Sequence, residues 1–327
     1  MAVLLLELVL RIGSGLMFPA LYELDTKLGW VHTPSVSRTL ADEDGRVITF
    51  ATDARGLRAT LHVEPRNAAR KRVLFVGDSF TQGSQVEADE LFTRRVERAL
   101  PEIEAWNLGV GGYSTLQELR ALQPRLATLA PDLVVLVVFE NDFVDNLMPY
   151  FSGLGPRPHL VVRGAEVVEI TSPDVEAFRR FLMPTPGAFW CYEHLALYRT
   201  LHKNLFLPAA GDRLAALEHA ERAAVPLAQQ HQAMQWSLTQ FQQVLTSAGA
   251  RLLVAAIPTH EAAAVGPAAS HVWLADHCRS AALPFVSLLE ALRDPQCYFR
   301  NDIHLTAAGH AAVASALAPA VAAALRH

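Results

Sequence analysis

The sequence has few cysteines, no cluster of positive charge and no long uninterrupted apolar run. Its three cysteines are odd in number and lack the short paired spacing of a zinc site, which argues against a disulfide framework and a metal site. The formal net charge is -5 and the longest basic run is Arg70–Arg72, so no nucleic-acid partner is expected. The uninterrupted apolar runs are also shorter than the roughly 20 residues that a membrane-spanning helix needs.

Residues 1–25 are mostly apolar but do not have the form of a secretory signal. No basic residues precede the apolar part, and Glu7 and Arg11 interrupt it. Because these two residues are four positions apart, they could pair on one face of a helix. The segment is then an interfacial helix or the end of a membrane anchor, or else a helix that packs on the protein's own body. A membrane-anchored or extracytoplasmic location and a cytoplasmic one both remain open.

The rest of the chain divides into an arm and one large unit. With 327 residues, 51% of them hydrophobic, the chain can bury a single large core. In residues 26–70 an Asp44–Gly45 turn precedes an alternation of apolar and polar residues, which predicts a hairpin or an extended arm. Residues 71–327 form the main domain, which carries an insertion at about residues 147–228.

Short apolar runs alternate with helical patterns throughout the main domain. The runs are Val73–Val76, Ile103–Leu108, Leu133–Phe139, Leu252–Ile257 and Pro284–Leu288. Helix start signals include a capping box at Ser114 and a Thr306 cap before an Ala-rich helix that Pro319 could kink or divide. This order predicts an α/β fold, a three-layer α/β/α sandwich whose mainly parallel sheet is covered by helices on both faces.

The insertion follows the third of these strands and is richer in proline and aromatic residues than the rest. Tyr150, Phe151 and Trp190 are among its aromatic residues. In open α/β sheets, ligands bind beyond the carboxyl ends of the strands, so the insertion could form an acyl or acceptor pocket. The alternative is that its aromatic side chains make a small core of their own.

One serine lies where such a fold would place a nucleophile. Ser79 follows the strand Val73–Val76 and a Gly-Asp turn, at the point where a helix should begin. Backbone N–H groups and the positive end of the helix dipole favour negative charge there. The alternative is a serine that only caps the helix at Phe80. A serine hydroxyl is a weak nucleophile, so catalysis would also need a base and oxyanion donors.

Two further stretches could supply oxyanion donors. The glycine-rich turn Asn107–Tyr113 follows the second strand, and its glycines let the backbone approach a ligand closely. Asn141 follows the third strand, where a neutral side-chain amide could donate a hydrogen bond. Tight-turn packing and a turn-forming Asn-Asp pair are the respective alternatives.

The stretch before the last helix supplies a base. Asp302 precedes His304 by two residues, and a carboxylate so close can hold the imidazole in the tautomer that accepts the serine proton. Of the thirteen histidines, His304 alone has a carboxylate two residues before it and a capped helix after it. His310 is expected to lie on that helix in a structural role.

Together these four stretches resemble the SGNH, or GDSL-type, hydrolase family of serine esterases, lipases and acyl-transfer enzymes. The resemblance runs from about residue 55 to the C-terminus, and it implies a flavodoxin-like central sheet. It implies an oxyanion hole made by Ser79, Gly112 and Asn141. It also implies a catalytic set of Ser79, Asp302 and His304 that needs no cofactor.

Two positions depart from the common pattern of that family. The family more often has an aspartate three residues before the histidine, where this sequence has Asn301. We expect Asp302 to orient His304, and a serine–histidine dyad assisted by Asn301 is the alternative. Glu140 stands where the family more often has glycine, so its carboxylate could narrow the pocket or point away.

The resemblance implies hydrolysis of a short acyl or acetyl ester through an acyl-enzyme, with a small-molecule ester or an acylated glycan as substrate. An O-acyltransferase acting on a cell-surface glycan and a catalytically silent carbohydrate-binding module are the alternatives. The stretches Arg55–Arg58 and Val86–Asp89 are also similar to membrane-associated bacterial members, in which an anchor precedes the domain. The sequence predicts no oligomeric state.

Overall fold

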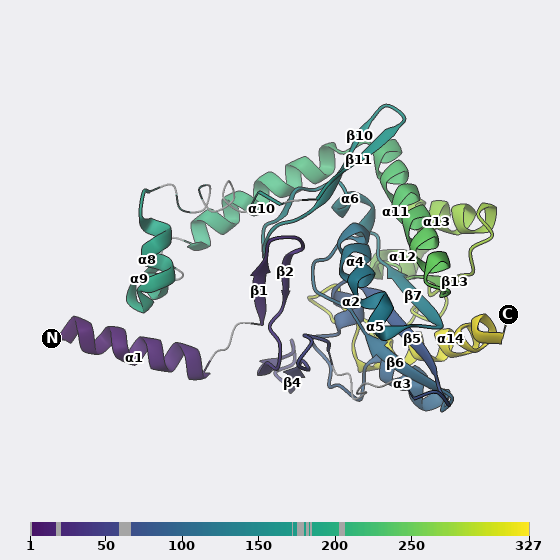
Figure 1. Ribbon diagram of the computed structural model, residues 1–327, viewed down its shortest axis with the longest axis horizontal. Coiled ribbons are helices and arrows are strands. Elements are labelled where there is room, and N and C mark those ends of the chain that lie inside the picture. Colours follow the sequence, from purple (N-terminus) through teal and green to yellow (C-terminus); the bar gives the residue numbers. More distant parts are fainter. Residues whose placement is uncertain are drawn as a thin grey trace.

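A five-stranded parallel sheet forms the centre of the computed structural model, which describes residues 2–17, 21–58, 67–171, 173, 174, 180, 183, 185–202 and 207–326. The strands are β5 (Lys71–Gly77), β6 (Ile103–Asn107), β7 (Leu133–Val138), β12 (Arg251–Ala256) and β13 (Phe285–Ser287). Their order across the sheet is β13-β12-β7-β5-β6 (Figure 1). Counted along the chain this is 2-1-3-4-5, so the predicted flavodoxin-like parallel sheet is confirmed.

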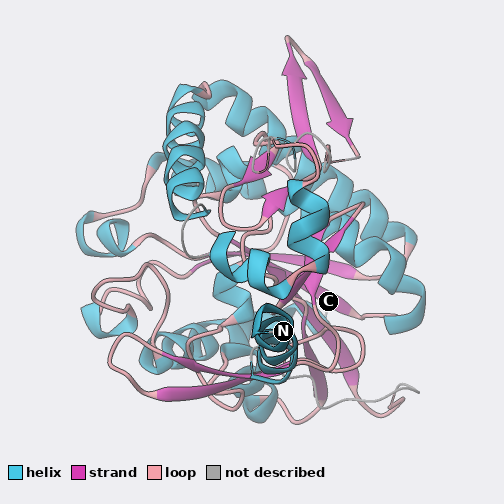
Figure 2. Ribbon diagram, turned by 90° about the vertical axis from the view of Figure 1, so that its left-hand side faces the viewer, coloured by secondary structure: helices cyan, strands magenta, loops and turns pink. Residues whose placement is uncertain are grey.

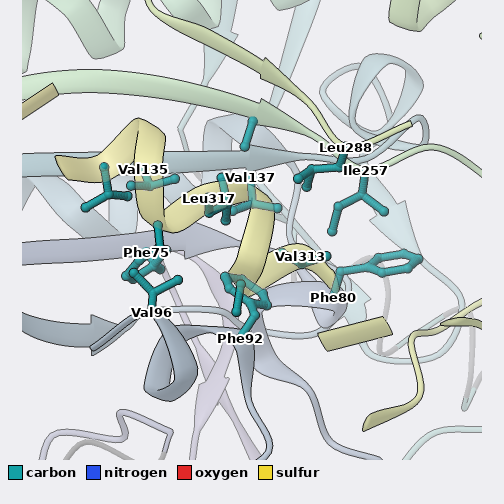
Figure 3. Packing of buried hydrophobic residues seen from close by; sticks show 14 of the residues in the cluster. Phe75, Phe80, Phe92, Val96, Val135, Val137, Ile257, Leu288, Val313 and Leu317 are labelled. Carbon is teal, nitrogen blue, oxygen red and sulfur yellow. The ribbon is translucent and has the colours of Figure 1, made fainter. Parts of the chain in front are cut away.

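Side chains of the strands alternate between two apolar layers, because successive residues of a strand point to opposite faces. Val73 and Phe75 of β5 lie in one layer, which Figure 3 shows packed against Phe92. Leu74 and Val76 lie in the other layer. Helices α3 (Phe92–Ala99) and α14 (Ala307–Arg326) cover the first face, and α4 (Thr115–Leu122), α11 (Leu227–Ser247) and α13 (Ala269–Ser280) cover the second. The predicted three-layer sandwich is therefore confirmed.

The predicted helix caps at Ser114 and Thr306 are confirmed. Ser114 Oγ accepts from the backbone N–H of Gln117, whose side chain accepts from Ser114 N at 3.0 Å, so the capping box is present. Thr306 Oγ1 accepts from Gly309 N at 3.2 Å at the start of α14.

Of the two effects predicted for Pro319, a kink or a division of the last helix, the division is wrong, because α14 runs through Pro319 as one element. Leu317 and Val321, which flank the proline, are fully buried against the sheet. This packing outweighs the one backbone hydrogen bond that a proline removes. Within the described residues, α14 is also the helix whose length and apolar composition would allow it to cross a membrane.

The arm forms two antiparallel hairpins. They are β1 (Tyr22–Asp25) with β2 (Gly29–His32), and β3 (Ser37–Ala41) with β4 (Val47–Ala51). The hairpin expected around the Asp44–Gly45 turn is therefore confirmed, and Gly45 has the positive φ of 78° that such a turn requires. Residues 59–66 of the predicted arm lie outside the described residues.

The insertion contains three pairs of elements that lie outside the central sheet. They are β8 (Tyr150–Phe151) with β9 (Gly155–Pro156), β10 (His159–Arg163) with β11 (Glu166–Ile170), and α8 (Ala188–His194) with α9 (Ala196–Leu201). Helix α10 (Leu207–Ala224) then leads back to α11. The β10–β11 hairpin projects beyond the sheet in Figures 1 and 2.

Helix α1 (Ala2–Met17) lies beside α8 and α9, away from the central sheet (Figure 1). The predicted partner of Glu7 was Arg11, whose side chain lies outside the described residues. The Glu7 carboxylate accepts from Ala196 N and Leu197 N, both at 2.8 Å, and so caps the start of α9.

The remaining elements are single turns or short helices. They are α2 (Ser79–Gln82), the 3₁₀ turn η1 (Gln123–Arg125), α5 (Leu126–Leu129), α6 (Asp142–Asp145), α12 (His260–Val265) and the 3₁₀ turn η3 (Pro295–Cys297). Two of them, α2 and α6, begin at the carboxyl ends of neighbouring strands and carry the residues described next.

Candidate active site

Ser79 is the first residue of α2 and follows the end of β5 directly. The Asp78 side chain accepts from Phe80 N at 2.9 Å and caps this turn. Gly77 allows the tight turn, since a Cβ there would lie 2.2 Å from Thr81 Oγ1 and 3.0 Å from the carbonyl oxygen of Val137. The packing beneath the turn therefore leaves Ser79 at the sheet's carboxyl edge, where its side chain is partly exposed.

His304 lies beside this serine although 225 residues separate them in the sequence. Its Nε2 is 2.7 Å from Ser79 Oγ, and its Nδ1 is hydrogen-bonded to Asp302 Oδ1. Asp302 Oδ1 also accepts from His304 N at 2.9 Å, and Oδ2 accepts from Gln85 Nε2 at 2.9 Å. Both oxygens of the Asp302 carboxylate are therefore hydrogen-bonded. The carboxylate contacts Nδ1, the ring nitrogen of His304 that does not face Ser79.

The electrostatics of Asp302 favour a permanent carboxylate. Partial burial by itself would raise the pKa of Asp302, but hydrogen bonds from His304 and Gln85 and the proximity of the imidazole lower that pKa below its usual value. The carboxylate can therefore accept from Nδ1–H and leave Nε2 free to take a proton from Ser79.

Asn301 does not contact the imidazole in this arrangement. It is exposed, and its backbone N–H donates to Glu43 Oε2 at 2.8 Å. The neighbouring Arg300 N donates to Glu43 Oε1 at 2.6 Å. The arm hairpin β3–β4 thus holds the loop that carries Asp302 and His304.

The glycine-rich turn lies against the same helix α2. A Cβ at Gly109 would be 2.3 Å from Gln82 N, and Gly111 N donates to Gln82 Oε1. Trp30 Nε1, from the arm, donates to the carbonyl oxygen of Gly111 at 3.0 Å. That carbonyl shares a peptide plane with the N–H of Gly112, so Trp30 fixes the direction of this N–H. Among the described residues, the N–H groups of Ser79 and Gly112 have no acceptor.

Asn141 follows β7 and precedes α6. Its Nδ2 donates to Asp145 Oδ2 at 2.8 Å, and its amide is close enough to lower the pKa of Asp78 by hydrogen bonding. The amide thus reaches the base of the Ser79 turn. Glu140 does not share this environment, since its Oε1 accepts from Ser270 Oγ of α13 at 3.1 Å.

Three buried carboxyl groups lie beneath the site. Burial raises the pKa of Asp78 to about 6. Burial, together with the charge of neighbouring carboxylates, raises the pKa values of Glu118 and Asp142 well above the usual range. The raised pKa values of Glu118 and Asp142 favour their neutral forms, which limits the negative charge beneath Ser79.

One large cavity lies apart from Ser79 and His304. It has a volume of about 800 Å³ and lies between the arm and α4, where Leu28, His32, Leu108 and Tyr113 contribute to its wall.

Within the described residues, no group of three or more histidine, cysteine, aspartate or glutamate side chains could hold a metal ion. Of the three cysteines, Cys278 and Cys297 are buried and Cys191 is partly buried.

The structure adds residues that sequence reasoning missed. Gln85, Glu43 and Trp30 each contact a loop of the site from a distant part of the sequence. Arg157 does the same from the insertion, where it donates to the carbonyl oxygen of Gly112 at 3.0 Å. No local pattern marks these four residues, because each reaches the site through long-range contacts.

Comparison with known proteins identifies one family. The profile described as GDSL-like Lipase/Acylhydrolase matches residues 73–317, which is well over half of the chain. No curated protein matches the sequence.

Several solved structures are similar in fold at low sequence identity. A GDSL-like lipase from Bacteroides thetaiotaomicron has 13% identity over 80% of this chain and 93% of its own, with a TM-score of 0.43. The psychrotrophic esterase EstA from Pseudoalteromonas sp. has 12% identity over 79% of this chain and 100% of its own, with a TM-score of 0.44. A variant of the acetyl xylan esterase Axe2 from Geobacillus stearothermophilus has 12% identity over 77% of this chain and 94% of its own, with a TM-score of 0.40.

Proposed function

Because this chain belongs to the GDSL-like lipase/acylhydrolase family, and is therefore a carboxylic ester hydrolase, we propose that it cleaves a short acyl or acetyl ester through an acyl-enzyme on Ser79. The observation that carries this proposal is the hydrogen-bonded series from Ser79 Oγ through His304 to Asp302. A serine adjacent to a base that is oriented by a third group is the arrangement that nucleophilic catalysis requires.

In the first step, His304 Nε2 takes the proton of Ser79 as Oγ attacks the ester carbonyl carbon. The carbonyl oxygen becomes an oxyanion, which the N–H groups of Ser79 and Gly112 and the amide of Asn141 stabilise. Asp302 stabilises the imidazolium that forms and keeps the imidazole in its orientation. The tetrahedral intermediate then collapses, the bond to the leaving alkoxide breaks, and His304 gives the proton to that oxygen.

In the second step, a water molecule replaces the alcohol. His304 takes a proton from the water as its oxygen attacks the acyl-enzyme, and then returns the proton to Ser79 Oγ. Free acid and free enzyme result. The proposed substrate is a small-molecule ester or an acylated glycan, and the free acid distinguishes hydrolysis from acyl transfer to a sugar hydroxyl.

The test is hydrolysis of p-nitrophenyl acetate by the purified chain and by Ser79→Ala. We expect the variant to fall to the background rate, because no other described group replaces the nucleophile. Ser84→Ala, five residues later and outside the proposed site, is the matched control and should keep the wild-type rate. A fluorophosphonate probe should label the wild type and not Ser79→Ala. Hydrolysis retained by Ser79→Ala would refute the assignment, and a wild type that neither hydrolyses nor reacts would favour a silent binding module.

A further inference from the structure

We infer that Arg157 and Asp145 form a positioning pair that fixes the two oxyanion donors Gly112 and Asn141 relative to each other. This inference rests on the proposed function, because it concerns how the oxyanion hole of that reaction is held. Arg157 belongs to the insertion and follows β9, whereas Asp145 ends α6. Neither residue would touch the substrate.

The Arg157 guanidinium spans the two loops. Its Nη1 donates to the carbonyl oxygen of Gly112 at 3.0 Å, and its Nη2 donates to Asp145 Oδ1 at 2.9 Å. Its Nε donates to the carbonyl oxygen of Met148 at 3.2 Å. The side chain is fully buried, so water does not compete for these hydrogen bonds.

Asp145 extends this connection to the other donor. Its second oxygen, Oδ2, accepts from Asn141 Nδ2 at 2.8 Å. A side-chain amide has two N–H bonds, so the hydrogen bond to Asp145 leaves the second within reach of Asp78 and of an oxyanion at Ser79. The carboxylate also fixes which end of the amide is the donor, since a carboxylate can only accept.

The loops that carry Gly112 and Asn141 need such a connection, because neither loop by itself fixes the direction of its own hydrogen-bond donor. Gly112 has a positive φ of 74° and no side chain, so its peptide groups are held only by what contacts them. Arg157 fixes the peptide after Gly112, and Trp30 fixes the one before it. A side-chain amide likewise rotates unless a neighbour holds it.

Asp145 accepts from a second guanidinium group besides that of Arg157. Arg222 of α10 also donates to Asp145 Oδ1, so two guanidinium groups face this one carboxylate. Arg222 is 24% exposed and also pairs with Glu218, one turn earlier on α10. It therefore offers a control that touches Asp145 without touching Gly112 or Asn141.

The test compares the kcat and KM of p-nitrophenyl acetate hydrolysis in variants that keep or remove the connection. Arg157→Lys keeps the charge but cannot reach the same carbonyl and carboxylate oxygens together. The double variant Arg157→Met/Asp145→Asn removes both charges, so it leaves no unpaired buried ion. We expect kcat to fall about 10-fold to 100-fold in both, with KM changed little, because displaced donors weaken the transition state more than substrate binding. Arg222→Met should change kcat less than threefold.

A double-mutant cycle separates positioning from a merely structural role. Asp145→Asn alone should lower kcat, whereas in an Asn141→Ala background it should lower kcat by a clearly smaller factor, because the part of its effect that acts through Asn141 is already lost. An equal loss in both backgrounds would overturn the inference, as would wild-type kcat in a folded Arg157→Lys. Thermal unfolding of each variant, followed by circular dichroism, verifies folding. Failure of the proposed function is a distinct result, since it requires Ser79→Ala to retain activity.

Discussion

The two oxygens of the Asp302 carboxylate have different partners, and together they leave one orientation for the side chain. Oδ1 accepts from the backbone and the ring of His304, and Oδ2 accepts from Gln85. Asn301 is exposed, and its backbone N–H donates to Glu43. The backbone N–H of His304 donates to Asp302 and closes a short turn. This turn brings the Asp302 carboxylate to the imidazole, although Asp302 precedes His304 by only two residues.

Replacement of Asp302 should be far more harmful than replacement of Asn301. We expect Asp302→Ala to lower kcat on the order of a thousandfold or more, because the imidazole loses the acceptor that sets its tautomer and stabilises its charge. Asn301→Ala is the matched control and should stay within a few-fold of the wild type. Steady-state hydrolysis of p-nitrophenyl acetate measures both. The opposite ranking would indicate that Asn301 orients His304.

Among the elements, the β3–β4 hairpin has the clearest role at the site. Glu43 is 13% exposed and binds the backbone N–H groups of Arg300 and Asn301. Hydrogen bonds from these two N–H groups lower the pKa of Glu43, so it remains an anionic acceptor at neutral pH. The arm is thus part of the structure that positions the histidine loop, although it precedes the first strand of the sheet.

Loss of the Glu43 side chain should loosen that loop without unfolding the domain. We expect Glu43→Ala to lower kcat about threefold to tenfold, because a displaced base acts less efficiently, while the unfolding temperature changes little for a hairpin at the surface. Glu23→Ala, in the neighbouring β1–β2 hairpin, is the control and should resemble the wild type. Unchanged kcat in Glu43→Ala would mean that the loop keeps its geometry without this contact.

For the molecule as a whole, two buried histidines should make stability depend on pH. Burial lowers the pKa of His310 to about 3 and that of His32 to about 4 from an ordinary value of 6.5. His310 stacks on Phe92 and accepts from Phe92 N at 3.3 Å. The unfolded chain binds protons at these positions below pH 6.5 whereas the folded chain does not, so stability is complete above that pH and falls as the pH decreases.

These two histidines should therefore lower the free energy of unfolding between pH 7.5 and pH 5, whereas the raised pKa values of the buried carboxyl groups Asp78, Glu118 and Asp142 act in the opposite direction. Each of these two histidines is expected to contribute about 2 kcal/mol to the decrease, since their folded pKa values lie below this window. Urea unfolding at the two pH values measures it. His310→Gln should lose its share of the pH dependence, whereas His260→Gln, at the surface, should not. An identical pH dependence in His310→Gln and the wild type would show that His310 is not the group responsible.

The predicted association with a membrane also concerns the whole molecule. The described part of α1 exposes Val3, Leu4, Leu5, Leu6, Leu8 and Val9, with exposures from 46% to 75%. These residues lie on several sides of the helix, and the carboxylate of Glu7 is bound at the start of α9. Helix α8, which lies near α1 in Figure 1, carries the exposed Trp190 (58%). Apolar residues on several sides of a helix favour an apolar environment, which a membrane would supply.

We expect the purified chain to float with phospholipid vesicles on a density gradient. The Leu4→Glu/Leu5→Glu variant should remain at the bottom while it keeps the wild-type rate on p-nitrophenyl acetate. Val265→Glu, at an isolated exposed apolar residue of α12, is the control and should float. Floating of the α1 variant to the same extent as the wild type would rule out this helix as the contact.

The sheet, its parallel direction and the positions of Ser79, Gly112, Asn141 and His304 in the fold can be predicted from the sequence alone. These features follow from local patterns, because each strand and the turn after it are short segments, and the carboxyl ends of parallel strands meet at one edge of the sheet.

The contacts that hold the loops of the site in place become visible only in the folded protein. The contacts of Glu43, Trp30 and Arg157 with the loops of the site join residues far apart in the sequence. They depend on where the arm and the insertion pack, and no local pattern encodes that position. Asp302 is an intermediate case: its proximity to His304 is local, but its contact with Gln85 is formed only when α2 and the last loop come together. Long-range hydrogen bonds between buried or half-buried groups thus convert a recognisable set of residues into one geometry.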